Sequence, residues 1–505
     1  MPTLPARHLG DFILTTISTT LKPQQEIDLM TIARHQHWIG GMETSSSNGE
    51  YFADLNPIDD SLYAHAARGT ATDIEQAVQA AHASFATYGK SLPKEREGWL
   101  LRAADLLERR SSDFVDMLVD EVGSPLLKAQ REVETSIGIL RSAAGATRHL
   151  AGKTLPTDVS GRLSMSLRRP LGVIAGISPF NVPLIKDIKH SAMPLATGNT
   201  VVLLPSEHAP VTALKVATLF AEAGFPAGSF NVVTGFGAEI GDTLTCHPLV
   251  RMVGFTGSSR VGHHISTLCG ERAKRYSLEM GGKNPLVILK DAEIDKAVQG
   301  SVIGSFLYQG QICMASSRIY VEKPVYDEFQ TKFLAAARNL GMDDLRRPST
   351  MIGPIIHETQ RARIKEHLKD AISKGAKVLC GGNWQGNRCE PTVLTDTNEH
   401  MQISHEETFG PVTTLHCVDS ADDALNLAND SNLGLSGSVY TTNLTQAMRF
   451  AEELNAGMVH VNGTTIQDEP HIPFGGVGDS GFGRESTDPD LSEFMEWKWV
   501  TFQHN

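Results

Sequence analysis

The stretch Met252-Val-Gly-Phe-Thr-Gly-Ser-Ser-Arg-Val-Gly262 combines an apolar strand, a turn of small residues and the start of a helix. The free N–H groups and the dipole at such a helix start favour an anion such as a pyrophosphate. A strand that leads through a small-residue turn into a helix is typical of nucleotide-binding α/β domains. We therefore expect residues 252–262 to lie at a cofactor site.

Short β-rich runs alternate with helical segments on both sides of this stretch, which is the signature of β-α-β units on a parallel sheet. The helical segments are 211–223 and 239–246, and the strand candidates are 172–177, 200–204, 230–233, 252–255 and 285–289. A second α/β pattern follows Cys313 and predicts a second domain. Its strand candidates are 318–322, 377–379, 413–418, 437–440 and 458–461.

The segment before residue 150 is predicted to be helical. Thr72 and Glu75 have the spacing of a capping box, and apolar residues follow at helical intervals, so a helix is expected to start at Thr72. Residues 95–142 show the same periodicity. The segment 235–241 has the pattern G-x-G-x-x-x-G, one residue longer than the dinucleotide fingerprint, and is weak evidence by itself.

Two segments fit neither α/β pattern. Residues 163–167 alternate apolar and polar side chains, and residues 494–502 are apolar on both faces, with Trp497 and Trp499 close together. Strands at a domain edge and at a chain terminus are candidates for pairing across a subunit interface. We favour this interpretation, because an exposed tryptophan pair would be a costly apolar patch, over the alternative of ordinary edge strands.

Composition places the 505-residue chain among ordinary globular proteins, with 41% hydrophobic and 20% charged residues. The net charge of −13, without any Lys/Arg cluster longer than a pair, argues against nucleic acid as a partner. Six cysteines without C-x-x-C spacing are typical of thiols in a reducing compartment. The chain has neither a signal-peptide core nor an apolar run of about 18 residues, so we expect a cytoplasmic protein without a membrane partner or bound metal.

Six motifs follow one another along nearly the whole chain and together resemble the aldehyde dehydrogenase superfamily. They are Pro179-Phe-Asn-Val-Pro183, Pro205-Ser-Glu207, Leu278-Glu-Met-Gly-Gly-Lys-Asn-Pro285, Gln309-Gly-Gln-Ile-Cys-Met314, Glu406-Glu-Thr-Phe-Gly-Pro411 and Pro473-Phe-Gly-Gly476. The separation of 34 residues between Glu279 and Cys313 matches the family's usual interval between general base and nucleophile.

The resemblance implies an α/β fold with a Rossmann-type cofactor domain, an α/β catalytic domain and a β oligomerisation arm in a homodimer or homotetramer. The implied boundaries are 1–150 and 171–281 for the NAD(P)-binding domain, 282–480 for the catalytic domain, and 151–170 with 485–505 for the arm. The first 30 residues precede the matching part, and no role is predicted for them.

The chemistry of aldehyde oxidation explains the residue types. Hydride loss from a planar carbonyl is difficult, whereas addition of a thiolate gives a tetrahedral thiohemiacetal that can expel hydride to a nicotinamide. Cys313 is the candidate nucleophile, and the resemblance supplies the Asn181 amide and the Cys313 backbone N–H as oxyanion donors. Glu279 is expected to activate the water that hydrolyses the thioester, and Glu485 to help relay its proton.

Two other functions are compatible with the same motifs. Family members that transfer the acyl group to coenzyme A generally lack the glutamate, because hydrolysis would compete, so Glu279 favours release of a free acid. A non-catalytic relative that keeps the fold is the second alternative. The complete set of Asn181, Glu279 and Cys313 argues against it.

The expected cofactor is NAD, with NADP as the alternative. A carboxylate on the adenine ribose, the role implied for Glu207, would repel a 2′-phosphate. The family's usual lysine at position 204 is Leu204 here, which leaves this selectivity open. The residues implied to bind the cofactor are Ser206, Glu207, Gly237, Gly257, Ser258, Glu407 and Phe409.

A second departure from the family pattern is His190, nine residues after Asn181, where the family often has a lysine near the catalytic glutamates. On a helix the neighbouring Lys189 would point about 100° away, so it is not expected to substitute.

The aldehyde pocket is expected to be mostly apolar, which fits a flat hydrophobic aldehyde better than a semialdehyde carboxylate that would require an arginine. Residues 304–314 and 459–470 are similar to the branch that contains benzaldehyde, salicylaldehyde and vanillin dehydrogenases, so an aromatic aldehyde is the expected substrate. The implied pocket residues are Val182, Ile185, Tyr308, Ile312, Met314, Ile466, Gln467 and Phe474.

Overall fold

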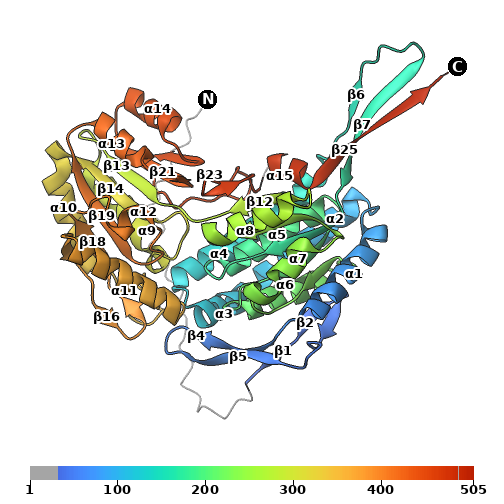
Figure 1. The fold of residues 1–505 in the computed structure, drawn as a ribbon, viewed down its shortest axis with the longest axis horizontal. Helices are drawn as coiled ribbons and strands as arrows, with labels where there is room; N and C mark the ends of the chain where they lie inside the picture. Colours follow the sequence, from blue (N-terminus) through green and yellow to red (C-terminus); the bar gives the residue numbers. More distant parts are fainter. Residues whose placement is uncertain (1–31, 487, 505) are drawn as a thin grey trace, which may run out of the picture. The chain divides into compact units, whose positions relative to one another are not determined.

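The computed structural model describes residues 32–486 and 488–504, without the side chains of residues 488–490. The first 30 residues lie outside the described residues. Within these residues, no helix is long and apolar enough to cross a membrane. Figure 1 shows the elements in their sequence colours, from blue at the N-terminal side to red at the C-terminal side.

An eight-stranded sheet of order β24-β12-β11-β8-β9-β10-β2-β3 forms the centre of the first half of the chain (Figure 1). The strands from β12 to β10 are parallel. From β8 the chain runs outward through β9 and β10, and it then returns to β11 and β12 on the other side. This reversal makes a topological switch point, where ligands bind at the carboxyl ends of the strands. The bounds are β2 His37–Ile39, β3 Met42–Thr44, β8 Val173–Ile177, β9 Thr200–Leu204, β10 Phe230–Val232, β11 Val250–Thr256, β12 Arg275–Glu279 and β24 Gly481–Phe482.

Helices cover both faces of this sheet and bury two separate apolar clusters, because successive strand side chains point to opposite faces. The predicted helices 211–223 and 239–246 are present, whereas 95–142 is divided into three helices. Gly123 ends the second of them in the left-handed conformation, at φ 65°. The bounds are α1 Ala71–Tyr88, α2 Pro93–Arg109, α3 Ser111–Val122, α4 Leu126–Ala146, α5 Pro183–Ala196, α6 Pro210–Glu222, α7 Gly237–Cys246 and α8 Ser259–Gly270.

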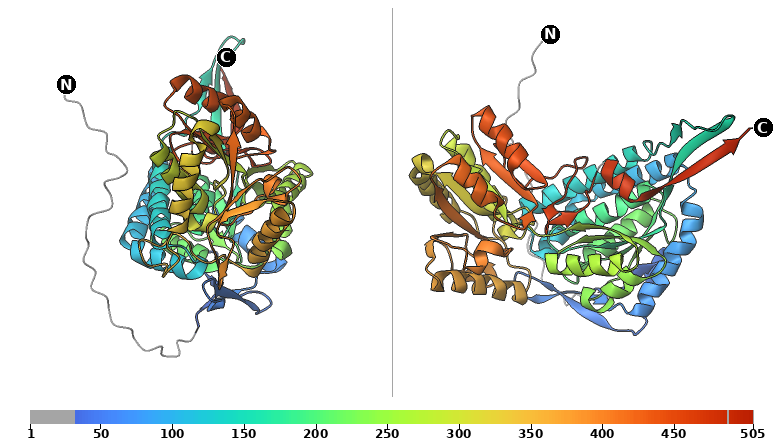
Figure 2. Two further views of the ribbon diagram at one scale, coloured as in Figure 1. Left: turned by 90° about the vertical axis from the view of Figure 1, so that its left-hand side faces the viewer. Right: turned by 45° about the horizontal axis from the view of Figure 1, so that its top comes forward.

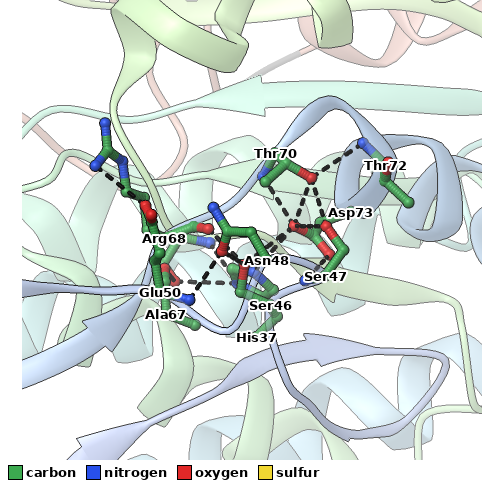
Figure 3. A network of polar contacts seen from close by, with 11 residues as sticks. His37, Ser46, Ser47, Asn48, Glu50, Ala67, Arg68, Thr70, Thr72 and Asp73 are labelled. Carbon is green, nitrogen blue, oxygen red and sulfur yellow. Dashed lines mark hydrogen bonds and ion pairs between the residues drawn. The ribbon is translucent and has the colours of Figure 1, made fainter.

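The start of α1 differs from the predicted one by two residues. Thr70 is the N-cap, and its hydroxyl oxygen accepts a hydrogen bond from the N–H of Thr72 at 3.2 Å. The Asp73 carboxylate accepts the backbone N–H of Thr70 at 2.8 Å and that of Ser47 at 2.9 Å (Figure 3). The capping box is therefore Thr70 with Asp73, and the predicted box of Thr72 with Glu75 is wrong.

A seven-stranded sheet of order β15-β18-β19-β14-β13-β21-β22 forms the second α/β unit. The predicted strand 285–289 belongs here as β13 and not to the first sheet, while β12 and β18 were not predicted. The strands are β13 Asn284–Ile288, β14 Ser316–Glu322, β15 Lys377–Cys380, β18 Thr392–Thr395, β19 Val412–Val418, β21 Ser436–Tyr440 and β22 Met458–Val461. The helices are α9 Ile294–Phe306, the 3-10 helix η2 Leu307–Gly310, α10 Lys323–Arg338, α11 Glu358–Ser373, α12 Gln402–His405, α13 Ala421–Asn429, α14 Leu444–Glu453 and α15 Asp488–Glu493.

Several short strands complete the description. β1 (Arg34–His35), β5 (Ser61–Ala67) and β4 (Tyr51–Asn56) form a small sheet. Two-stranded pairs join β16 (Trp384–Gln385) to β17 (Arg388–Cys389) and β20 (Leu433–Gly434) to β23 (Val477–Gly478).

The two segments that fitted neither pattern pair with each other in the same chain. β7 (Arg162–Pro170) lies between β6 (Lys153–Leu155) and β25 (Met495–Gln503), and Trp497 is opposite Arg168. Figures 1 and 2 show these strands extending away from the helices. Trp499 is 67% exposed within one chain, so the apolar surface expected from the sequence is present.

Candidate active site

Two asparagines hold the loop that carries Cys313, between η2 and β14. The Asn284 side-chain amide donates hydrogen bonds to the carbonyls of Cys313 at 2.8 Å and Ala315 at 2.9 Å. The Asn181 side-chain amide donates to the carbonyl of Gln311 at 3.1 Å. Because Asn181 follows β8 and Asn284 begins β13, the loop is fixed to both α/β units. The structure thus brings Asn181 next to the Cys313 loop, as the sequence predicted.

The turn before Cys313 is strained and supported by buried hydrogen bonds. Tyr308 and Gln309 have positive φ angles of 51° and 46°. The Tyr308 hydroxyl donates to the Val122 carbonyl at 2.8 Å, and the Gln309 amide donates to the Pro354 carbonyl at 2.6 Å. Such backbone conformations persist only where the surroundings determine them. This turn therefore presents Cys313 in a fixed orientation.

The surroundings of Cys313 favour the thiol over the thiolate. Burial raises the pKa of the Cys313 thiol to about 12, although the nearby Lys186 ammonium acts in the opposite direction. The thiol therefore requires a base and a stabilising charge before it can act as a nucleophile.

Glu279 ends β12 as a buried acid, with 2% of its surface exposed. Neither carboxyl oxygen has a hydrogen-bond partner among the described residues. Burial, together with the negative charge of Glu485, raises the pKa of Glu279 well above its usual range. An unpartnered acid with a raised pKa suits a general base that acts on a bound water.

Glu485 is held by two lysines that the sequence reasoning did not assign to the site. Its carboxylate lies 2.8 Å from the Lys186 ammonium and 3.6 Å from that of Lys189. Burial alone would raise the pKa of Glu485, but the two lysines outweigh it and lower the pKa to about 2. Glu485 is therefore ionised at neutral pH.

His190 packs against the central sheet. Its Nε2 lies 3.1 Å from the Thr256 hydroxyl. Gly176 and Gly254 leave room for the side chain, since a Cβ on Gly254 would lie 2.9 Å from the ring Nδ1 and a Cβ on Gly176 would lie 2.9 Å from the His190 Cβ. Lys189 does point in a different direction from His190. However, its ammonium lies 3.6 Å from the Glu485 carboxylate, so Lys189 is close to one of the two candidate catalytic glutamates.

The predicted phosphate and ribose contacts lie at the carboxyl ends of the central strands. Ser258 is the N-cap of α8, and within the described chain no side chain caps this helix, which leaves N–H groups of its first turn for an anion. Ser206 and Glu207 follow β9, where the Ser206 hydroxyl accepts the N–H of His208 at 3.3 Å. Gly237 begins α7.

Leu204 is a core residue at the end of β9, with 1% of its surface exposed. It packs in the apolar cluster under α1, α7 and α8. This position therefore supplies no charge to a ribose or a 2′-phosphate.

The Glu407 carboxylate packs directly against the glycines of the 278–285 motif. Its carboxylate accepts the Gly282 N–H at 3.3 Å, and a Cβ on Gly281 would lie 2.3 Å from a Glu407 oxygen. Burial raises the pKa of Glu407 to about 7. Phe409, at φ 53°, packs edge-on against Phe180 with ring centres 6.0 Å apart.

A histidine pair beside these aromatic rings was missed by the sequence reasoning. His208 and His357 stack with ring centres 4.5 Å apart, and the edge of Phe180 contacts both. Burial lowers the pKa of each imidazole to about 4, so both are neutral. The two histidines come from different α/β units and carry no common local signal in the sequence.

The predicted pocket is only partly apolar. Five of its residues pack in one cluster with Cys313, namely Tyr308, Ile312, Met314, Ile466 and Phe474. Ile185 packs instead against the helical core of the first unit, and neither Val182 nor Gln467 belongs to any apolar cluster of the described residues. The ammonium groups of Lys186 and Lys189 lie 4.7 and 4.3 Å from the Phe474 ring centre. The expectation of few fixed charges was therefore incomplete.

The profile of the "Aldehyde dehydrogenase family" matches residues 44–500. A salicylaldehyde dehydrogenase of Pseudomonas putida is 38% identical over 462 residues, which cover 91% of this chain and 96% of the relative. A vanillin dehydrogenase of Corynebacterium glutamicum is 37% identical over 468 residues, which cover 92% and 97%.

Solved structures give the same result. The crystal structure of a salicylaldehyde dehydrogenase from Pseudomonas putida G7 complexed with salicylaldehyde has a TM-score of 0.91 at 37% identity, covering 94% of this chain and 98% of that chain. A betaine aldehyde dehydrogenase from Staphylococcus aureus in complex with NAD+ has a TM-score of 0.91 at 29% identity, covering 94% and 96%.

Proposed function

Because the chain belongs to the aldehyde dehydrogenase family, we propose that it oxidises an aromatic aldehyde to the carboxylic acid with NAD. NAD(P)-dependent aldehyde oxidation is the activity of this chain. The observation that supports the detailed mechanism best is the buried, unpartnered Glu279 carboxyl group, which lies close enough to the Cys313 thiol to perturb its pKa. Glu279 also favours hydrolysis to a free acid over transfer to coenzyme A.

Cys313 attacks the aldehyde carbon after its proton is removed. A base such as ionised Glu279 takes the thiol proton, and the Lys186 ammonium stabilises the thiolate, because it lowers the pKa of Cys313. The new C–S bond converts the carbonyl into a tetrahedral oxyanion. Bound NAD supplies the acceptor for the hydride that leaves this carbon.

The Asn181 amide and the Cys313 backbone N–H are the donors for the oxyanion. Asn181 uses one amide proton on Gln311 and keeps the second available for a ligand. Removal of one such donor typically costs a factor of about 10²–10³ in kcat.

Glu279 then acts on the thioester. Its ionised form accepts a proton from a water, which attacks the acyl carbon and releases the acid from Cys313. We propose that Glu485 does not relay this proton, because an acid with a pKa of about 2 is a poor acceptor from Glu279. Its fixed charge instead positions Lys186.

The residues at the strand ends fit a nicotinamide dinucleotide. The uncapped start of α8 at Ser258 suits the pyrophosphate, Ser206 and Glu207 suit the adenine ribose, and Glu407 suits the nicotinamide ribose beside Phe409. Gly237 begins α7, the helix that follows β10, at the same carboxyl-end edge of the central sheet. The carboxylate of Glu207 without a cation at position 204 favours NAD over NADP.

We propose the same division into parts as the sequence implied, with residues 1–150 and 171–281 binding the cofactor, 282–480 holding the nucleophile, and 151–170 with 485–505 forming an oligomerisation arm. The exposed Trp497 and Trp499 on β25 support a homodimer or homotetramer. Six free thiols are consistent with a cytoplasmic enzyme.

Reduced-nicotinamide absorbance tests the function. Purified protein is mixed with benzaldehyde, vanillin, salicylaldehyde or hexanal, each with NAD and with NADP, beside a Cys313→Ala variant. We expect turnover of the aromatic aldehydes with NAD that disappears in Cys313→Ala, while Cys417→Ala, a matched change at an exposed cysteine, stays active. Turnover of hexanal alone would contradict the aromatic proposal.

A further inference from the structure

Lys186 and Lys189 form a buried pair of cations on α5. Their side chains are 3% and 2% exposed. Residues three apart on a helix lie on one face, so both ammonium groups project to the same side. Burying two charges is costly unless each is paired, and here Glu485 and Asp468 supply the partners.

Both ammonium groups lie against an aromatic ring of the predicted aldehyde pocket. They are 4.7 and 4.3 Å from the centre of the Phe474 ring, and Phe474 packs in the cluster that contains Ile312, Met314 and Cys313. The lysines thus lie beside the cluster to which the nucleophile belongs.

The two ammonium groups have spare hydrogen-bonding capacity. Each carries three N–H donors. Lys186 makes one hydrogen bond, to Glu485, and Lys189 makes one, to Asp468 at 3.0 Å. Four of the six donors therefore have no acceptor among the described residues.

The partner of Lys189 is the more exposed of the two carboxylates. Asp468 follows Ile466 and Gln467 in an irregular loop, its side chain is 16% exposed, and its carboxylate lies 2.9 Å from the Lys189 ammonium. The Glu485 side chain is 10% exposed and contacts both lysines. Asp468 is therefore the carboxylate better placed to turn toward water.

We propose that Lys189 binds an anionic group of the aldehyde substrate, which replaces the Asp468 carboxylate while Asp468 turns to solvent. The exchange of one carboxylate for another leaves the net buried charge unchanged, because Lys189 is paired with Asp468 before the exchange and with the substrate anion after it. The inference rests on the proposed function and names its substrate class: an aromatic aldehyde with a ring carboxylate or an ionised phenol remote from the formyl group.

Paired substrates test the proposal. Steady-state kinetics compare 4-formylbenzoate and 4-hydroxybenzaldehyde, at pH values that protonate or ionise the phenol, with benzaldehyde and 4-methoxybenzaldehyde. The measured quantity is the ratio of kcat/KM for each anionic aldehyde to kcat/KM for benzaldehyde. The test variants are Lys189→Met and Asp468→Asn. The matched control is Lys296→Met, which removes an exposed lysine of α9 that pairs with Glu293.

We expect Lys189→Met to lower the ratio at least tenfold, mainly through KM, and Asp468→Asn to raise it, because the competing carboxylate is gone. Lys296→Met should leave it unchanged. Comparison of 4-formylbenzoate with ionised 4-hydroxybenzaldehyde shows whether the site prefers a carboxylate or a phenolate. An unchanged ratio in both pocket variants, with thermal unfolding like that of the wild type, would overturn the proposal. Benzaldehyde turnover that depends on Cys313 would still support the proposed function.

Discussion

Replacing Glu485 by glutamine tests whether Glu485 acts as a fixed charge that positions Lys186 or as a carrier of the proton from Glu279. The Glu485 carboxylate contributes to the raised pKa of Glu279, and it holds Lys186 at 2.8 Å. Glu485→Gln removes the repulsion and frees Lys186 to stabilise ionised Glu279. Both effects lower the pKa of Glu279.

The size of the effect follows from the charges. An opposite charge within about 4–6 Å lowers a carboxyl pKa by about 1–3, a like charge raises it, and loss of the Glu485 charge removes that increase. Glu279 acts as a base only above its pKa. In the pH profile of the deacylation rate, the fall on the acidic side (the acidic limb) should therefore move at least about one pH unit lower. Lys189, His190 and Arg484 also face this pair and are unchanged.

The assay is rapid mixing of enzyme, NAD and aldehyde between pH 5 and 9, which separates the NADH burst from the later, deacylation-limited rate. Glu485→Asp keeps the charge and serves as the control, with its limb close to that of the wild type. A slower rate at every pH without a shift of the limb would refute this reasoning and indicate that Glu485 carries the proton.

The remaining predictions concern four positions. Asn181→Ala should lower kcat by about 10²–10³ with little change in aldehyde KM, and a change in KM alone would contradict its role as an oxyanion donor. Glu279→Gln should keep a burst of about one NADH per site but slow the later rate by about 10² or more; a lost burst would mean that the thiol needs Glu279 absolutely. Gly281→Ala should weaken NAD binding in a fluorescence titration, because the Cβ would crowd Glu407, and unchanged affinity would argue against Glu407 as a ribose ligand. Burial and a neighbouring carboxylate raise the pKa of Asp54 from 3.8 to about 9, so Asp54 stabilises the fold below pH 4 and loses this stabilisation as the pH rises toward 9. Asp54→Asn should therefore raise Tm by an amount that grows between pH 4 and 9, and a constant difference would contradict the assigned pKa.

The sequence predicts most of the catalytic arrangement because each motif has a local cause. The small-residue turn at 256–258 requires a strand before it and a helix after it, and both are present. Gly281 and Gly282 are needed where Glu407 and the Cys313 loop approach closely. These requirements act over a few residues, so the pattern shows them.

Other features depend on tertiary contacts that no local pattern reveals. α5 is buried on nearly all sides, so its periodicity does not show that Lys186 and Lys189 face the pocket. The polar residues of β12 hide a strand that lies inside the sheet, next to the short edge strand β24. The capping box of α1 was placed two residues late because Thr72 with Glu75 and Thr70 with Asp73 have similar spacing.

The pairing of β7 with β25 has a consequence for synthesis. Trp497 pairs with Arg168, which is 329 residues earlier in the chain. At about 5–20 residues per second, β7 waits about 16–66 s on the ribosome before its partner strand has been made. During that interval its open edge can capture another nascent chain, and the exposed tryptophans appear only when the last residues are added. The association of subunits that we propose for the arm would thereby be postponed until translation ends, and a chain that stops before residue 495 would leave the edge of β7 open to aggregation.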